Sequence, residues 1–354
     1  MDLIDKADAI RQGETLDVEK LGTALRGALP HLMGEVVVAQ FRKGHSNLTY
    51  LVRVGHDEMV LRRAPFGTKV KGAHDMGREY KVLAHLQGIY APAPKPLAFF
   101  EDAEIVGAPF YVMQRIKGVI FRANKPEELD LTPALARACA ETFIQNLADL
   151  HAIDFRAAGL AELQRPGNYV ERQVNGWAER YKGSQTDEIA SIDDAFAWLK
   201  KAIPPDSDAT LVHNDYKYDN LVLAPDGLTK IIGVLDWEMA TIGDPLADLG
   251  TALGYWTDPG EEDPLSVTRC FLTNAPGSLS RMELAQRYAE LTGRDISNLL
   301  YYYVLALLKL AVIVQQIYYR YAKGLTHDER FAIMIEIVKI LGQRASETIA
   351  TGKV

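Results

Sequence analysis

The sequence predicts an α+β protein with two lobes, a small antiparallel sheet lobe followed by a larger, mainly helical lobe. The chain has 354 residues, whereas one domain usually holds about 150. Strand patterns dominate up to about residue 116, and helical patterns dominate after it. We therefore expect a first lobe at residues 1–116, in which residues 1–34 form a helical extension, and a second lobe at residues 117–354.

Composition and charge restrict the class of protein. Hydrophobic residues make up 48% of the chain and charged residues 24%, which is typical of a folded soluble protein. The 39 basic and 47 acidic residues give a net charge of −8. This argues against nucleic acid as a partner, because phosphate backbones need a basic surface. Two cysteines without CxxC spacing exclude a disulfide scaffold, and the scattered histidines give no zinc motif, so oxygen ligands would hold any bound metal.

The amino terminus and one apolar stretch bear on location. The first residues are acidic and polar and lack the basic and apolar regions of a secretory signal, so we expect a cytoplasmic protein. Residues 299–314 are apolar, but Lys309 interrupts them and Gln315, Gln316 and Arg320 follow. A membrane span needs about 20 nearly uninterrupted apolar residues. We therefore expect a buried core helix and no membrane partner.

The first lobe shows strand patterns joined by short loops. Apolar and β-branched residues predict strands at residues 35–41, 48–54, 59–63, 97–100 and 110–115. Asp75 is placed to cap a helix whose apolar residues follow at helical spacing. Pro92, Pro94 and Pro96 end that helix. The pattern predicts a small sheet with one helix against it.

The second lobe is mainly helical, with one β signal. Helices are predicted at residues 133–151, 169–181, 188–202, 246–255, 281–291, 296–321 and 328–349. Between the third and the fourth of these, strands at residues 221–223 and 231–235 flank a turn favoured by Pro225, Asp226 and Gly227. Residues equally distant from a hairpin turn face each other, so we expect Asp236 opposite Lys217.

This hairpin collects groups that suit phosphoryl transfer. It would bring Asp236 to the loop that contains Asp215, Lys217 and Asn220. Carboxylate and amide oxygens are hard ligands that suit Mg²⁺, whose coordination is usually completed by substrate phosphates. The simpler alternative is that Asp215 and Asp219 cap turns and Asp236 ends a strand. The combined spacing favours a magnesium-dependent phosphotransferase.

Three motifs resemble a known family. HNDYKYDN at residues 213–220 resembles the catalytic loop of the protein-kinase-like fold, in which an asparagine that binds metal follows an aspartate by five residues. LDWE at residues 235–238 resembles the metal-binding DFG motif, and ATIGDPLADLG after it is similar to the aminoglycoside phosphotransferase family of small-molecule kinases. The resemblance covers residues 35–340 and looks most like a subgroup that also occurs fused to acyl-CoA dehydrogenases in animals. It implies a bilobal, protein-kinase-like fold.

The resemblance implies a role for each matching residue of the hairpin region. Asp215 would be the base that orients the acceptor hydroxyl and receives its proton. Lys217 would neutralise charge on the transferred phosphoryl group, with a solvated surface lysine as the alternative. Asn220 and Asp236 would hold Mg²⁺.

Other matching residues would support the site. Arg62 stands where the fold usually has a phosphate-binding lysine, and its planar fork also suits phosphate oxygens. Glu79 would pair with Arg62, although exposed helical glutamates are common. His213 and Asp248 would fix the backbone of the catalytic loop, and Trp237 would pack in the core.

The rest of the nucleotide site is implied by position along the chain. The loop with Gly44 and Ser46 would cover the phosphates through backbone N–H groups and the serine hydroxyl, with a plain hairpin turn as the alternative. The segment from Gln114 to Ile116 would be the hinge whose backbone reads adenine.

The sequence thus predicts a kinase that transfers the γ-phosphate of ATP to a hydroxyl of a small molecule. The subgroup points to a hydroxyacyl-CoA-like acceptor. Glu261, Glu262 and Asp263 could instead attract a cationic amino sugar, although a solvated loop is the simpler interpretation. The alternatives are a nucleotide-binding pseudokinase, which has no need of a base, and a metal-dependent phosphoester hydrolase, which leaves the pairing of Arg62 with Glu79 unexplained.

Overall fold

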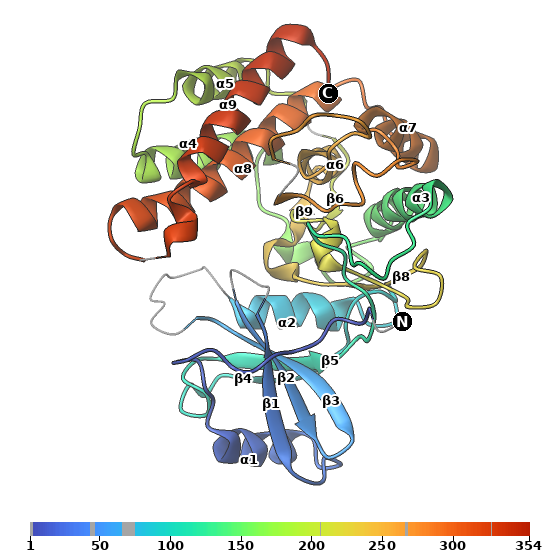
Figure 1. Cartoon of the computed structure of the whole chain (residues 1–354), viewed down its shortest axis with the longest axis vertical. Coiled ribbons are helices and arrows are strands. Elements are labelled where there is room, and N and C mark those ends of the chain that lie inside the picture. The colour runs from blue at the N-terminus through green and yellow to red at the C-terminus, as the bar shows by residue number, and fades with distance from the viewer. Residues whose placement is uncertain (1–2, 43–46, 66–74, 206, 266–267, 327) are drawn as a thin grey trace. The chain divides into compact units, whose positions relative to one another are not determined.

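The computed structural model describes the chain except residues 1–2, 43–46, 66–74, 206, 266–267 and 327, and Figure 1 labels its elements. The chain divides into two compact units. The first unit comprises Met1–Ile120 and Asn220–Ala240, and the second comprises Phe121–Asp219 and Thr241–Val354. The functions expected of the two lobes, nucleotide binding by residues 1–116 and catalysis and acceptor binding by residues 117–354, stay predictions.

The first unit is built on an antiparallel sheet. Its strands, in the spatial order β1-β2-β3-β5-β4, are β1 Val36–Phe41, β2 Leu48–Val54, β3 Asp57–Arg63, β5 Phe110–Gln114 and β4 Pro96–Phe100. Helices α1 (Val18–Ala28) and α2 (Met76–His85) lie on opposite faces of the sheet (Figure 1). Asp75 caps α2 as predicted, because its side chain accepts the backbone N–H of Arg78 at 2.9 Å.

The alternation of side chains along β3 separates the apolar core from the polar residues of this unit. Met59 and Leu61 belong to the apolar core that includes the buried leucines of α1. Successive side chains of a strand point to opposite faces. Arg62 therefore lies on the face covered by α2, and its partner across the sheet on β5 is Tyr111.

A short hairpin completes the first unit. It consists of β7 (Leu221–Leu223) and β8 (Ile231–Val234), followed by the 3₁₀ turn η3 (Trp237–Met239). The predicted turn is present, and Gly227 has the positive φ of +85° that favours glycine.

The register of this hairpin differs from the predicted one. Leu221 pairs with Val234, whereas the predicted register would place it opposite Ile232. The expectation that Asp236 lies directly opposite Lys217 was therefore wrong. The physical reason is an irregularity in β8: Val222 pairs with Gly233 but Leu223 pairs with Ile231, so Ile232 is an extra residue as in a β-bulge, and counting from the turn does not give the register.

The second unit is mainly helical. Its helices are α3 Pro133–His151, α4 Tyr169–Ser184, α5 Ala190–Lys201, α6 Pro245–Gly254, α7 Arg281–Thr292, α8 Leu299–Ala322 and α9 Met334–Thr351. A two-stranded ladder pairs β6 (Thr210–Val212) with β9 (Thr241–Gly243), a strand that the sequence did not predict. Short 3₁₀ turns are η1 Ala161–Leu163, η2 Tyr218–Asn220 and η5 Glu329–Phe331. The predicted helix at residues 328–349 begins later, because Asp328 caps η5 instead and α9 follows it.

Helix α8 is the central helix of the second unit. By length and composition it could cross a membrane, and 67% of its most apolar window is buried inside the protein, as expected of a core helix. It packs against α4, α5, α6 and α9. A Cβ atom at Gly250 of α6 would lie 2.6 Å from the backbone oxygen of Tyr302 in α8, so glycine is what allows these two helices to approach so closely.

Candidate active site

Asp215 lies between β6 and η2, and two side chains hold its carboxylate. The Nζ atom of Lys217 is 3.1 Å from Oδ1 and 3.0 Å from Oδ2. The hydroxyl of Tyr255 donates to Oδ1 at 2.7 Å. The ammonium of Lys217 also lies 4.6 Å from the centroid of the Tyr255 ring, a favourable cation–π distance. The Asp215 side chain is 18% exposed, so a ligand can still reach the carboxylate.

The surroundings keep Asp215 ionised. Burial opposes its ionisation, but the ammonium of Lys217 and the hydrogen bonds from Tyr255 and Lys217 outweigh that effect and hold the pKa of Asp215 below its usual value. Burial alone would lower the pKa of Lys217, but Tyr255 and Asp215 raise that pKa above its usual value. A carboxylate of low pKa is a weak base, better suited to orienting a hydroxyl and taking its proton late than to removing it early.

The backbone before Asp215 is fixed from α6. Asp248 accepts the N–H of His213 on Oδ2 and the N–H of Asn214 on Oδ1, both at 2.7 Å. His151 Nε2 lies 3.2 Å from Oδ2 of the same carboxylate. The prediction that Asp248 fixes the loop backbone is confirmed, and His213 takes part through its N–H. Asn214 has the left-handed φ of +65°, which asparagine tolerates better than most residues.

A second cluster lies in the first unit, around Arg62. The Nε atom of Arg62 is 3.3 Å from Oε2 of Glu79, and an Nη atom donates to Oδ1 of Asp236 at 2.6 Å. Oε1 of Glu79 accepts the backbone N–H of Trp237 at 3.0 Å. The expected pairing of Arg62 with Glu79 is present, and the bond to Asp236 is an addition. Trp237 is 1% exposed and packs in the core as predicted.

Burial and the neighbouring charges shift the pKa values of this second cluster. The side chains of Arg62 and Glu79 are 7% and 1% exposed. Burial raises the pKa of Glu79 despite the nearby guanidinium. Burial would lower the pKa of Arg62, but Asp236 and Glu79 raise it above its usual value. Burial, followed by the charge of Asp236, raises the pKa of Glu238 to about 7, and the amide of Asn47 donates to Glu238 at 2.6 Å.

Two residues of the first unit fit magnesium by their donor chemistry. Asn220 and Asp236 carry amide and carboxylate oxygens, and the backbone oxygen of Asn220 accepts the N–H of Leu235, the residue before Asp236. The Asp236 side chain is 25% exposed. Within the described residues no three acidic, histidine or cysteine side chains form a metal cluster. A site with two protein oxygens suits Mg²⁺, which keeps waters and takes substrate phosphate oxygens.

For the remaining predicted site residues, the structure shows few contacts that bear on nucleotide binding. Gly44 and Ser46 lie outside the described residues. Gln114 ends β5 with an exposed side chain. The side chain of Ile116 packs against β8, where a Cβ atom at Gly233 would lie 2.9 Å from its Cδ1. The parts of these residues in nucleotide binding stay predictions.

Sequence reasoning missed two residues near Asp215. Tyr255 follows α6 and has no sequence signal that marks it. Lys309 lies in α8, and its Nζ donates to the backbone oxygen of Asn214 and lies 3.4 Å from Oγ1 of Thr251. A single lysine within an apolar helix could have marked Lys309, because lysine is almost never fully buried unless its ammonium has a partner.

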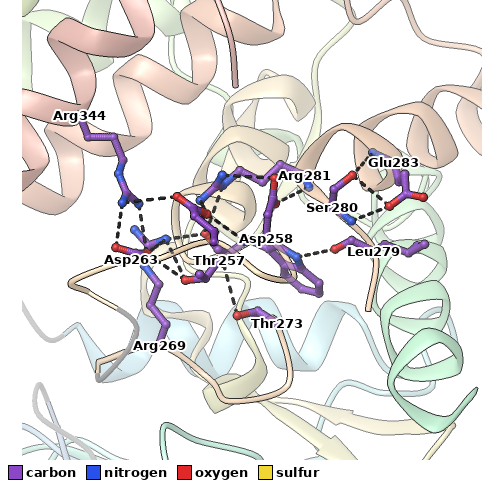
Figure 2. A network of polar contacts seen from close by, with 12 residues as sticks. Thr257, Asp258, Asp263, Arg269, Thr273, Leu279, Ser280, Arg281, Glu283 and Arg344 are labelled. Carbon is purple, nitrogen blue, oxygen red and sulfur yellow. Dashed lines mark hydrogen bonds and ion pairs between the residues drawn. The ribbon is translucent and has the colours of Figure 1, made fainter. Parts of the chain in front are cut away.

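Of the acidic residues after α6, Asp258, Glu261 and Asp263 take part in a network of polar contacts (Figure 2), whereas Glu262 is exposed, as expected of a solvated loop. Arg281 lies 2.6 Å from Glu261, Arg344 lies 2.8 Å from Asp263, and Arg269 lies 3.0 Å from Asp263. The Asp263 side chain is fully buried. The expectation of a solvated loop was therefore wrong for Asp263, because Arg269 of the same loop and Arg344 of α9 neutralise it inside the fold.

An antiparallel sheet unit with a buried arginine–glutamate pair and a helical unit with an aspartate–lysine loop place the protein among kinase-like phosphotransferases. The sequence profile of the phosphotransferase enzyme family APH matches residues 37–269, and the chain belongs to this family. Acyl-CoA dehydrogenase family member 11 of Gallus gallus is 34% identical over 321 residues, which cover 89% of this chain and 40% of the chicken protein. The chain therefore spans less than half the length of that relative.

Solved structures show the same fold. A Ralstonia eutropha protein assigned to the aminoglycoside phosphotransferases has a TM-score of 0.77 and 28% identity, covering 94% of this chain and 99% of its own. Choline kinase of Cryptosporidium parvum has a TM-score of 0.65 and 16% identity, with 95% and 97% coverage. A mutant of the aminoglycoside phosphotransferase APH(4)-Ia, in complex with AMP-PNP and hygromycin B, has a TM-score of 0.60 and 17% identity, with 94% and 99% coverage. The predicted protein-kinase-like fold is confirmed.

Proposed function

We propose that this phosphotransferase moves the γ-phosphate of ATP to a hydroxyl group of a small molecule. Membership of the APH family supports phosphoryl transfer. The complex of APH(4)-Ia with AMP-PNP supports ATP as the donor. The observation that carries the proposal is the Asp215 carboxylate, which is ionised, partly exposed and held by Lys217 and Tyr255.

In the proposed reaction, Asp215 accepts a hydrogen bond from the acceptor hydroxyl and takes its proton as the new oxygen–phosphorus bond forms, while the bond between the γ-phosphorus and the bridging oxygen breaks and ADP leaves. Lys217 keeps the carboxylate ionised and neutralises charge that develops on the transferred group. Holding the hydroxyl in line with the phosphate can supply about 7 to 11 kcal/mol, whereas a general base adds roughly 10²- to 10⁴-fold in rate. Positioning is therefore the larger contribution.

The first unit would bind the nucleotide. Asn220 and Asp236 would hold Mg²⁺, which neutralises charge on the phosphates when it is bound. Arg62, oriented by Glu79, would contribute a further positive charge toward the same phosphates. The loop with Gly44 and Ser46 would cover the phosphates, and the backbone from Gln114 to Ile116 would bind adenine.

The acceptor is proposed to be a hydroxyacyl-CoA-like metabolite. The identity of 34% with acyl-CoA dehydrogenase family member 11 over 89% of this chain supports that class. An amino sugar is favoured less, because the arginines Arg281 and Arg344 already neutralise Glu261 and Asp263, acids that would otherwise attract a cation.

The test is turnover with Mg-ATP and a panel of hydroxyacyl-CoA thioesters, their free hydroxy acids and amino sugars, scored by ADP release and by the mass of the product. We expect Asp215→Asn to lower kcat by about 10²- to 10⁴-fold. We expect it to retain the thermal stabilisation by Mg-ATP, which is about 2.7 kcal/mol at 100 times Kd. Asp226→Asn, in the exposed hairpin turn, is the matched control and should leave kcat unchanged.

Each other outcome selects a different function. Stabilisation by nucleotide without ADP release for any acceptor would indicate a pseudokinase. Release of inorganic phosphate from phosphate esters without an acceptor would indicate a hydrolase. The absence of stabilisation by any nucleoside triphosphate, or full turnover by Asp215→Asn, would contradict the proposal.

A further inference from the structure

Lys309 is a buried cation in an otherwise apolar segment of α8. The residue is 5% exposed. Its Nζ atom donates to the backbone oxygen of Asn214, lies 3.4 Å from Oγ1 of Thr251, and lies 6.0 Å from the ring centroid of Trp177. Both oxygens are uncharged, and burial lowers the pKa of Lys309 to about 8. Burying an ammonium with neutral partners is costly, so its position calls for a physical explanation.

The residue that Lys309 contacts is held from several sides. The N–H of Asn214 donates to Asp248 at 2.7 Å, and the amide oxygen of its side chain accepts the hydroxyl of Tyr169 at 2.9 Å. The backbone oxygen of Asn214 accepts a hydrogen bond from Nζ of Lys309. A non-glycine residue at φ +65° is a sparsely populated conformation, which persists when the surroundings over-determine it. Asn214 meets this condition.

The oxygen that Lys309 binds belongs to the peptide group that joins Asn214 to Asp215. On the other side of the same peptide group, the N–H of Asp215 donates to Nδ1 of His213 at 3.3 Å. Fixing both ends of a planar peptide group fixes the position of the next Cα atom, and this limits the directions in which its side chain can leave. The direction of the Asp215 side chain is therefore set partly from α8.

We propose that Lys309 and Tyr169 are positioning residues that clamp the peptide before Asp215, so that its carboxylate meets the acceptor hydroxyl in a reactive geometry. The proposal rests on the proposed role of Asp215 as base. It predicts a loss in kcat rather than in nucleotide binding, because both side chains belong to the second unit, whereas the residues proposed to bind the nucleotide belong to the first. Misplacement of a reacting group by about 1 Å can cost roughly 10²-fold in rate.

The test compares Lys309→Met with a matched control on the same helix. Gln315 is also buried, and its amide donates to the backbone oxygen of Ser184 at 2.8 Å and to Thr186 at 2.9 Å, in the segment that ends α4. Gln315→Met therefore removes buried hydrogen bonds of α8 without touching the clamp. We expect Lys309→Met to lower kcat by about 10- to 100-fold with KM for ATP within about twofold, and Gln315→Met to retain kcat.

A pH profile provides a readout that loss of packing alone would not move. The charged groups that act on Lys309 are Asp215, Asp248 and Lys217. Its ammonium favours ionised Asp215, so Lys309→Met should move the acidic limb of kcat to higher pH. Gln315→Met should leave that limb in place.

Hydrogen exchange and a second variant test the clamp even if no acceptor is found or Lys309→Met does not fold. Amide hydrogen exchange in residues 211–218 needs no acceptor, and it should accelerate in Lys309→Met but not in Gln315→Met. Faster exchange in a protein that phosphorylates no acceptor would support the clamp while contradicting the proposed function. Tyr169→Phe removes one hydroxyl and should lower kcat by a smaller factor. A wild-type kcat in folded Lys309→Met, or in Tyr169→Phe if Lys309→Met does not fold, would overturn the proposal.

Discussion

Arg62→Met is the change whose effect on stability follows most directly from the structure. Arg62 forms ion pairs with two carboxylates, Glu79 at 3.3 Å and Asp236 at 2.6 Å. Its removal leaves Glu79, whose side chain is 1% exposed, as a buried acid without its cation. Methionine has a similar apolar stem, so the main effect is electrostatic rather than a cavity.

The expected loss in the free energy of unfolding is about 3 to 5 kcal/mol, the usual cost of removing one partner of a buried ion pair. Glu79→Gln should cost less, because the amide oxygen can still accept the N–H of Trp237. The double variant lacks both the cation of Arg62 and the buried charge of Glu79. The double variant should therefore lose less free energy of unfolding than the sum of the two single losses, by about 0.5 to 3 kcal/mol.

Urea unfolding of the four proteins measures this cycle. Circular dichroism follows the whole chain, and tryptophan fluorescence adds a second probe because Trp237 is buried beside Glu79. Coincident transitions are required before a single free energy is assigned, because two units can unfold separately. A loss below about 1 kcal/mol for Arg62→Met, or additive single effects, would refute the reasoning.

Three other changes test separate parts of the structure. Tyr255→Phe removes a charge-assisted hydrogen bond to Asp215, so kcat should fall about tenfold and its acidic limb should move to higher pH; an unmoved limb would contradict this. Gly250→Ala places a Cβ atom 2.6 Å from the Tyr302 carbonyl, so the urea midpoint should fall. Glu238 has a pKa raised from 4.5 to about 7, so wild-type stability should fall as pH rises through that range, and Glu238→Gln should flatten the urea midpoints measured across it.

The sequence was sufficient where the determining interactions are local. Strand alternation and helical spacing predicted most elements, because each pattern depends only on neighbouring residues. Asp75 was recognised as a cap for the same reason. The register of the hairpin was not predictable by counting from Gly227, because an extra residue in β8, Ile232, changes the pairing and nothing in the sequence marks it. The burial of Asp263 also escaped prediction, since its partner Arg344 lies 81 positions away along the chain.

The same distinction separates the groups proposed for chemistry from the groups that hold them. Asp215, Lys217 and Asn220 lie within one short segment, so their spacing alone marks them. Tyr255 follows Asp215 by 40 positions, and Lys309 follows Asn214 by 95. Tyr255 reaches the loop from the end of α6, which packs against β6, and Lys309 reaches it from α8, which packs closely against α6 at the glycine of position 250. A catalytic loop can therefore be found from its motif, whereas the residues that set its geometry become visible only when the packing of the helices is known.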